Sequence, residues 1–155
     1  MLSSNTYVGV DIGSESSMVF IDIKDLDKRL KKPFLVIHDV SGFNLLLERL
    51  NSVESEYNSK CILIVENTGN YSTVFAHFFS SKGFPVKLIN PIQTNRISKA
   101  GMRKAKTDKL DSILIAGMKS YNWVKSYDYK TVSTDYLKKL CRKYDSFVKQ
   151  RALIK

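Results

Sequence analysis

Cysteine is scarce in this chain: its 155 residues include only Cys61 and Cys141, which lie far apart. They form no Cys-x-x-Cys pair, and only His38 and His77 are present to complete a metal site, so a zinc centre is not expected. A chain of this length builds a core without disulfides or a structural metal, and one domain is the expected organisation. The cysteine usage favours a reducing cytoplasm.

Long hydrophobic runs are also lacking. No apolar stretch approaches the roughly 20 residues that a membrane-spanning helix needs. The first five residues have neither the basic flank nor the apolar core of a secretory signal, so we expect no secretion. The hydrophobic share of 43% and the aromatic share of 11% are nevertheless typical of a folded protein.

Acidic residues are few in the last part of the chain. Residues 91–155 carry sixteen Lys and Arg against five Asp and Glu, whereas residues 1–90 carry nine against ten. The net charge of +10 therefore comes from the region after residue 90. Such asymmetry indicates a polyanionic partner, most simply nucleic acid, although a soluble protein with a basic surface is the plainer alternative.

The order of expected elements indicates a fold class. Residues 7–13, 18–23 and 34–38 are β-rich and joined by short connections, which predicts an antiparallel meander. The next expected elements are a helix capped by Ser41, a strand at 61–66, a helix at 71–82, a strand at 85–89, a helix opened by Pro91 and a helix capped by Thr107. This is the plan of the ribonuclease H-like (RuvC-like) α/β fold, a mixed five-stranded sheet with helices on both faces. A doubly wound fold would need a helix between the first strands.

The last segment carries a heptad pattern. Leu137, Tyr144 and Arg151 are seven apart, and Leu140, Phe147 and Ile154 repeat the spacing three residues later. We therefore expect residues 1–125 to form the α/β domain and residues 126–155 to start a helical coiled coil. The seam would be covered by the domain itself or by a second copy, which would make a homodimer. No stop signal precedes the end of the chain, so we expect a fragment of a longer protein.

Four carboxylates stand at positions that this fold brings together. Asp11 lies near the end of the first strand, Glu66 ends the apolar fourth strand, and Asp108 and Asp111 share one face at the start of a helix. Converging carboxylates repel one another unless cations neutralise them, and two Mg²⁺ about 3.5–4 Å apart are the usual solution in phosphoryl transfer. Taken singly, Asp11 could cap a turn and Glu66 could be a surface residue at a strand end. The aspartate pair could be ordinary N-terminal helix residues, which the helix dipole favours.

Basic residues surround the aspartate pair and are candidates for phosphate contacts. They are Arg96, Lys99, Arg103, Lys104, Lys106 and Lys109. A second basic group lines the last helix, where a solvated helix face is the alternative: Lys138, Lys139, Arg142, Lys143, Lys149 and Arg151. Four aromatic residues lie between the helix capped by Thr107 and the last helix. They would either stack on bases or pack where these two helices meet: Tyr121, Trp123, Tyr127 and Tyr129.

Four segments in this order resemble a known family: residues 8–11, 66–71, 90–91 and 106–111. They resemble the N-terminal domain of the DEDD-motif insertion-sequence transposases, the family that includes the Piv DNA invertase. That domain is similar to the Holliday-junction resolvase RuvC. By this resemblance the DEDD set is Asp11, Glu66, Asp108 and Asp111. Ser112, where alanine is usual, and Asn67 are departures from the pattern.

The resemblance implies a Mg²⁺- or Mn²⁺-dependent transposase or site-specific recombinase of the prokaryotic cytoplasm, acting on DNA at the nucleoid. In family members the chain continues through a coiled coil, which joins subunits, and then forms a second domain. That second domain carries the serine believed to attack the DNA strand. This chain alone is therefore expected to be incomplete for recombination. The family also includes recombinases guided by a structured RNA, so a guide RNA is a further expected partner.

Three other functions stay open at this point. A stand-alone RuvC-like Holliday-junction resolvase has this size and fold, although the heptad tail and the segment 106–111 argue against it. A nucleic-acid-binding module of the same fold would keep the structure without the chemistry. An actin- or sugar-kinase-like ATPase would explain residues 10–14 as a phosphate loop, but such proteins need a second loop and usually a much longer chain.

Overall fold

The computed structural model describes residues 4–24, 32–100, 107–120 and 125–127, together with Arg142, Tyr144, Ser146 and Arg151. These last four positions are helical and exposed. They belong to the tail from about residue 133 to 155, which the heptad pattern predicts to be one helix. The rest of this tail, with most of its heptad seam, lies outside the described residues. The division into 1–125 and 126–155 therefore stays a prediction.

Six strands of the described residues form one mixed sheet, in the order β3-β2-β1-β4-β5-β6. They are β1 (Ser4–Ile12), β2 (Ser16–Asp22), β3 (Phe34–Ile37), β4 (Ser59–Glu66), β5 (Val86–Ile89) and β6 (Lys125–Tyr127). The first three strands are antiparallel, β4 and β5 run parallel to β1, and β6 is antiparallel to β5. The ribonuclease H-like prediction is confirmed.

The sixth strand was not among the five expected. It is only three residues long and pairs along β5 from Leu88 to Val86. A segment this short, Lys-Ser-Tyr, carries no alternation of apolar residues that a sequence pattern can detect. Its backbone hydrogen bonds to β5 define it instead, so only the folded sheet shows it.

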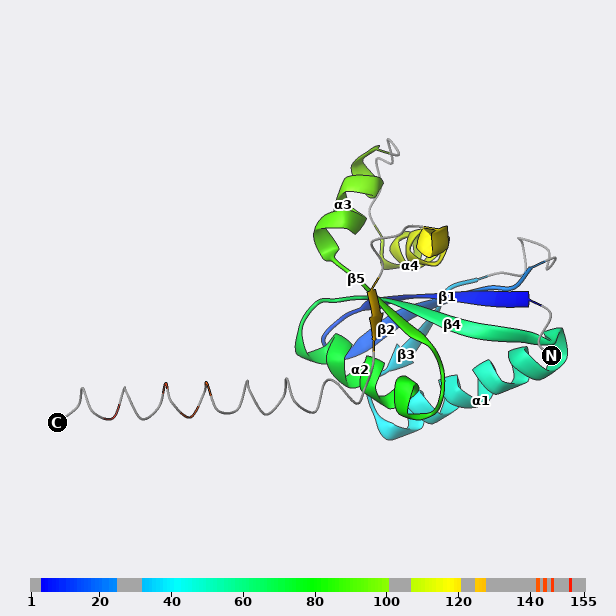
Figure 1. The fold of residues 1–155 in the computed structure, drawn as a ribbon, viewed down its shortest axis with the longest axis horizontal. Coiled ribbons are helices and arrows are strands. Elements are labelled where there is room, and N and C mark those ends of the chain that lie inside the picture. Colours follow the sequence, from blue (N-terminus) through cyan, green and yellow to red (C-terminus); the bar gives the residue numbers. More distant parts are fainter. Residues whose placement is uncertain are drawn as a thin grey trace.

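Helices cover both faces of the sheet, as expected (Figure 1). On one face lie α1 (Val40–Tyr57) and α2 (Asn70–Ser81), and α4 (Asp108–Gly117) covers the other, followed by a short turn η1 (Met118–Ser120). Helix α3 (Pro91–Ala100) follows β5 on the α4 side and extends away from the sheet. Thr107 caps α4 as predicted. The Ser41 cap was wrong: Asp39 is the N-cap of α1, because its side chain accepts a 2.6 Å hydrogen bond from the Gly42 amide.

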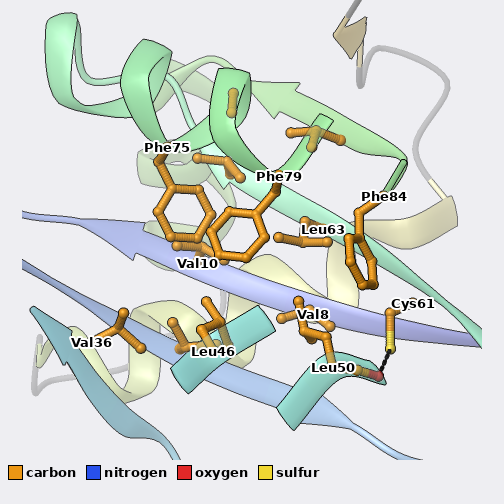
Figure 2. Close-up of a cluster of buried hydrophobic side chains, with 14 of the residues drawn as sticks. Val8, Val10, Val36, Leu46, Leu50, Cys61, Leu63, Phe75, Phe79 and Phe84 are labelled. Atoms are coloured by element: carbon orange, nitrogen blue, oxygen red, sulfur yellow. Dashed lines mark hydrogen bonds between the residues drawn. The ribbon is translucent and has the colours of Figure 1, made fainter. Parts of the chain in front are cut away.

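The main core lies between the sheet and the α1 and α2 face (Figure 2). Phe75 and Phe79 of α2 stack with ring centroids 4.6 Å apart and meet Leu63 of β4. Cys61 is buried here, with its thiol directed at the Leu50 carbonyl at 3.8 Å. Burial raises the pKa of Cys61 to about 12, so the thiol stays protonated and serves as a packing residue.

A smaller core lies under α4, where Ile64, Ile89, Ile115 and Met118 are buried. Gly9 of β1 permits α4 to approach the sheet, because a Cβ there would overlap the Ser112 carbonyl oxygen and lie 2.5 Å from the Ala116 nitrogen. Helix α4 therefore rests directly on β1, which fixes where its first turn lies. Among the described helices, none has the length and apolar character of a membrane span.

Candidate active site

An open cavity of about 430 Å³ lies at the carboxyl ends of β1 and β4, beside the first turn of α4. All four of the predicted carboxylate residues line it: Asp11, Glu66, Asp108 and Asp111. They come from two strands and one helix that are far apart in the sequence. The fold thus brings together the side chains that the sequence singled out.

Asp11 reaches the cavity through the alternation of β1. Val8 and Val10 point into the main core, so residues 7, 9 and 11 face the opposite side. Gly9 lies on that side directly beneath α4, and Asp11 follows two residues later, beyond the helix contact. Asp11 is half-buried there, between neighbouring strands on both sides of β1.

Glu66 ends β4, the parallel neighbour of β1. Val10 pairs with Val65, which places Glu66 level with Asp11 on the adjacent strand. Ile64 packs in the smaller core under α4, so Glu66, two residues on, shares that face. Its carboxylate accepts a 2.5 Å hydrogen bond from the hydroxyl of Thr94 in α3.

Asp108 and Asp111 occupy the first turn of α4. Thr107 begins this helix by accepting a 3.3 Å hydrogen bond from the Leu110 amide. The two aspartates are one helical turn apart, with Asp108 exposed and Asp111 half-buried. The positive end of the helix dipole stabilises their negative charge at this position.

The carboxylates fit a divalent metal ion in their chemistry, because oxygen donors of this kind suit Mg²⁺ and Mn²⁺. Their spacing in the structure is wider than ligation requires: within the described part of the chain, no three His, Cys, Asp or Glu side chains are close enough to hold one ion. Mutual repulsion of four carboxylates favours such a spacing. The four carboxylates that the sequence predicts for a metal site thus all line the cavity, but they lie farther apart than the ligands of one bound ion.

The turn between β1 and β2 forms another wall of the cavity, which the sequence did not indicate. Ser14, Glu15 and Ser16 line the cavity. His38 anchors this turn from the end of β3: its backbone amide donates to the Glu15 carbonyl at 2.9 Å, and its ring is hydrogen-bonded to the Ser17 hydroxyl at 2.5 Å. Burial lowers the pKa of His38, partly offset by a hydrogen bond to the backbone of Ser14.

Two further cavity residues, Thr94 and Asn95, come from α3. Sequence reasoning missed both. The segment 90–91 marked the start of this helix, but nothing in the pattern told which of its residues would face Glu66. That relation depends on how α3 packs beside the end of β4.

Of the six basic residues predicted to contact phosphate, the structure describes the side chains of two. Arg96 of α3 and Lys109 of α4 are exposed on the two helices that border the cavity. The side chains of Lys99, Arg103, Lys104 and Lys106 lie outside the described residues. Tyr127 packs against the main core, and burial raises its pKa, which supports the packing role rather than base stacking for this residue.

Comparison with known proteins identifies the family. The family model for DEDD transposases of the IS110 type matches residues 8–155. The chain belongs to this transposase family. It is also similar to the pilin gene-inverting proteins of Moraxella bovis and Moraxella lacunata, with 29% identity over 114 residues in each case. The match covers 73% of this chain and 34% of each relative, so the chain spans about a third of the length of these relatives.

Two solved structures resemble this chain. Thermus thermophilus RuvC matches with a TM-score of 0.48 and 15% identity, over 79% of this chain and 99% of RuvC. RuvC from the same organism in complex with a Holliday junction matches with a TM-score of 0.47 and 13% identity, over the same shares. The family predicted from the four sequence segments is confirmed by the family match.

Proposed function

We propose that this chain is the metal-binding catalytic domain of a DNA transposase or site-specific recombinase, and that Asp11, Glu66, Asp108 and Asp111 form its site. One observation carries the proposal: the four carboxylates of the family pattern line a single cavity at the ends of adjacent strands. Membership in the DEDD transposase family agrees with it.

The four carboxylates belong to two kinds of element. Asp11 and Glu66 stand side by side on a rigid sheet, whereas Asp108 and Asp111 stand on the first turn of a helix. Mg²⁺ or Mn²⁺, as two ions in the full site, would neutralise these charges and polarise the scissile phosphodiester. Asp11 and Glu66 would keep their places, and the first turn of α4 would close the remaining distance.

DNA is the proposed substrate, because exposed cations border the cavity and the region after residue 90 is strongly basic. Arg96 and Lys109 would hold the phosphate backbone on either side of the carboxylates. The whole recombinase would need the further domain that the family resemblance implies, and would work in the prokaryotic cytoplasm at the nucleoid. A structured guide RNA and a second copy joined through the helix over 133–155 are its further proposed partners.

Manganese binding by the purified chain tests the site. We expect Mn²⁺ counted by electron paramagnetic resonance to bind the wild type, and to bind Asp11→Asn and Glu66→Gln much more weakly. Glu48→Gln removes an exposed carboxylate of α1, remote from the cavity, and serves as the matched control. Equal binding by all variants, or no binding by any, would contradict the proposal.

A second candidate is a nucleic-acid-binding module without chemistry, and the wide spacing of the carboxylates favours it. The two functions differ in their need for metal. A module would bind branched DNA equally well with EDTA and with Mn²⁺, and would never nick it. The catalytic domain is expected to bind more tightly with Mn²⁺ and to nick weakly, and Asp108→Asn is expected to abolish the nicking.

A further inference from the structure

The backbone of Glu66 is fixed by its pairing with β5 and by the bonds that follow it, and within the described residues Thr94 is hydrogen-bonded to its carboxylate. The Asn67 amide donates to the Ile89 carbonyl at 2.8 Å, which ties the end of β4 to the end of β5. The Thr68 amide donates to the Glu66 carbonyl at 3.0 Å. With the main chain fixed, the direction of the carboxylate depends on rotation within the side chain.

Thr94 restricts that rotation. Its hydroxyl lies 2.5 Å from Glu66 Oε1, 3.1 Å from the carbonyl of Pro91 in its own helix, and 3.4 Å from the carbonyl of Asn90, which precedes the helix. A hydroxyl has one hydrogen to donate, and the charged, nearest acceptor receives it. Thr94 is only 6% exposed, so water competes little for this bond.

The same bond connects Glu66 to the helix that carries Arg96. Asn90 begins α3 by accepting a 2.9 Å hydrogen bond from the Ile92 amide, and Thr94 and Arg96 follow in the next turn. Displacement of α3 would therefore move the hydroxyl that orients Glu66. A phosphate contact at Arg96 that displaced α3 would therefore also displace the hydroxyl bonded to Glu66.

We propose that Thr94 is a positioning residue for Glu66, which sets the orientation of its carboxylate for a divalent cation and couples that orientation to α3. The inference rests on the proposed function, in which Glu66 is a metal ligand. Partners that orient a metal ligand in this way typically contribute 10- to 100-fold in metal affinity. Thr94 itself touches no metal in this account.

The test is Mn²⁺ affinity of the purified chain, measured by electron paramagnetic resonance. Thr94→Val keeps the shape of the side chain and removes the donor, and we expect it to raise the Kd for Mn²⁺ about 10- to 100-fold. Thr94→Ser restores the hydroxyl and is expected to return the Kd close to the wild-type value. This rescue separates orientation of Glu66 from a packing role, because serine lacks the methyl group.

Thr73 offers a matched control. Like Thr94, it is the fourth residue of its helix, and its hydroxyl contacts the carbonyl four residues earlier, at 3.1 Å from Gly69. It does not line the cavity. We expect Thr73→Val to leave the Kd for Mn²⁺ unchanged. Melting curves in EDTA show whether each variant is folded, and Thr94→Ala replaces Thr94→Val if valine destabilises the fold.

The outcomes distinguish the inference from the function on which it rests. If Glu66→Gln weakens Mn²⁺ binding while Thr94→Val and Thr94→Ala do not, Thr94 has no positioning role and the inference alone is overturned. If the wild type binds no Mn²⁺, or Glu66→Gln binds as the wild type does, both the inference and the proposed function are wrong. Weakened binding by Thr94→Val with rescue by serine supports both.

Discussion

Substitution of Gly9 by alanine is expected to separate α4 from the sheet. The new Cβ would overlap the Ser112 carbonyl oxygen and lie 2.5 Å from the Ala116 nitrogen and 3.0 Å from the Ala116 Cβ. The first two neighbours are backbone atoms, which cannot turn aside as a side chain does. Relief therefore requires outward movement of the helix, away from the buried Ile115 and Met118 contacts.

The expected cost follows from overpacking of a close contact, typically about 1–3 kcal/mol in the free energy of unfolding. Urea denaturation followed by circular dichroism measures this quantity. The matched control is Gly117→Ala, at the end of the same helix, where an added Cβ meets nothing within 4 Å. There alanine is expected to leave stability unchanged or raise it by up to about 1 kcal/mol, because it restricts the unfolded chain.

Two further measurements test whether the backbone contacts are responsible. Addition of Ala116→Gly to Gly9→Ala should not restore stability, since it removes only the 3.0 Å contact. Mn²⁺ affinity should also fall in Gly9→Ala, because the helix that moves carries Asp108 and Asp111. If Gly9→Ala is as stable as Gly117→Ala, α4 does not rest on β1 as described and the reasoning is refuted.

Three other predictions concern stability and reactivity at Asp39, Cys61 and His38, none of which belongs to α4. Asp39→Ala should lower the free energy of unfolding by about 0.5–2 kcal/mol through loss of the α1 cap, whereas Ser41→Ala should change it little in the same urea titration. Cys61, with its pKa raised to about 12, should resist alkylation by iodoacetamide at pH 8 in the native protein and should react once the protein is unfolded. Because the thiol ionises at about pH 9 in the unfolded chain, the stability that buried Cys61 contributes should be lost as the pH rises from about 9 towards 12. Burial lowers the pKa of His38, so on acidification the unfolded chain takes up a proton before the native protein does. The stability that neutral His38 contributes above pH 6.5 is therefore lost as the pH falls, and the difference in unfolding free energy between wild type and His38→Gln should narrow below pH 6.5.

The central strands and the family pattern were predictable because their signals are local. The apolar run before Glu66 is typical of a strand covered on both faces, and β4 is that strand. The β-rich segment 7–13, which contains Asp11, likewise predicts a strand, and β1 is that strand. Since parallel neighbours end at the same sheet edge, the convergence of these two carboxylates followed from the predicted topology.

Features that depend on packing between distant segments were not predictable. Asp39 and Ser41 are both good caps by residue type, and only the position of the first turn shows that Asp39 is used. Thr94 lies among several polar residues of α3, and its contact with Glu66 arises from how that helix is placed. The distances among the carboxylates also depend on tertiary structure and on charge, which no spacing in the sequence encodes.

The most direct test of the central claim is anomalous scattering from crystals of the chain grown with Mn²⁺. We expect manganese peaks inside the cavity, ligated by carboxylate oxygens of Asp11 and Glu66, with Asp108 or Asp111 drawn in from α4. Peaks only at other places on the molecule, with the four carboxylates unliganded in well-defined density, would contradict it.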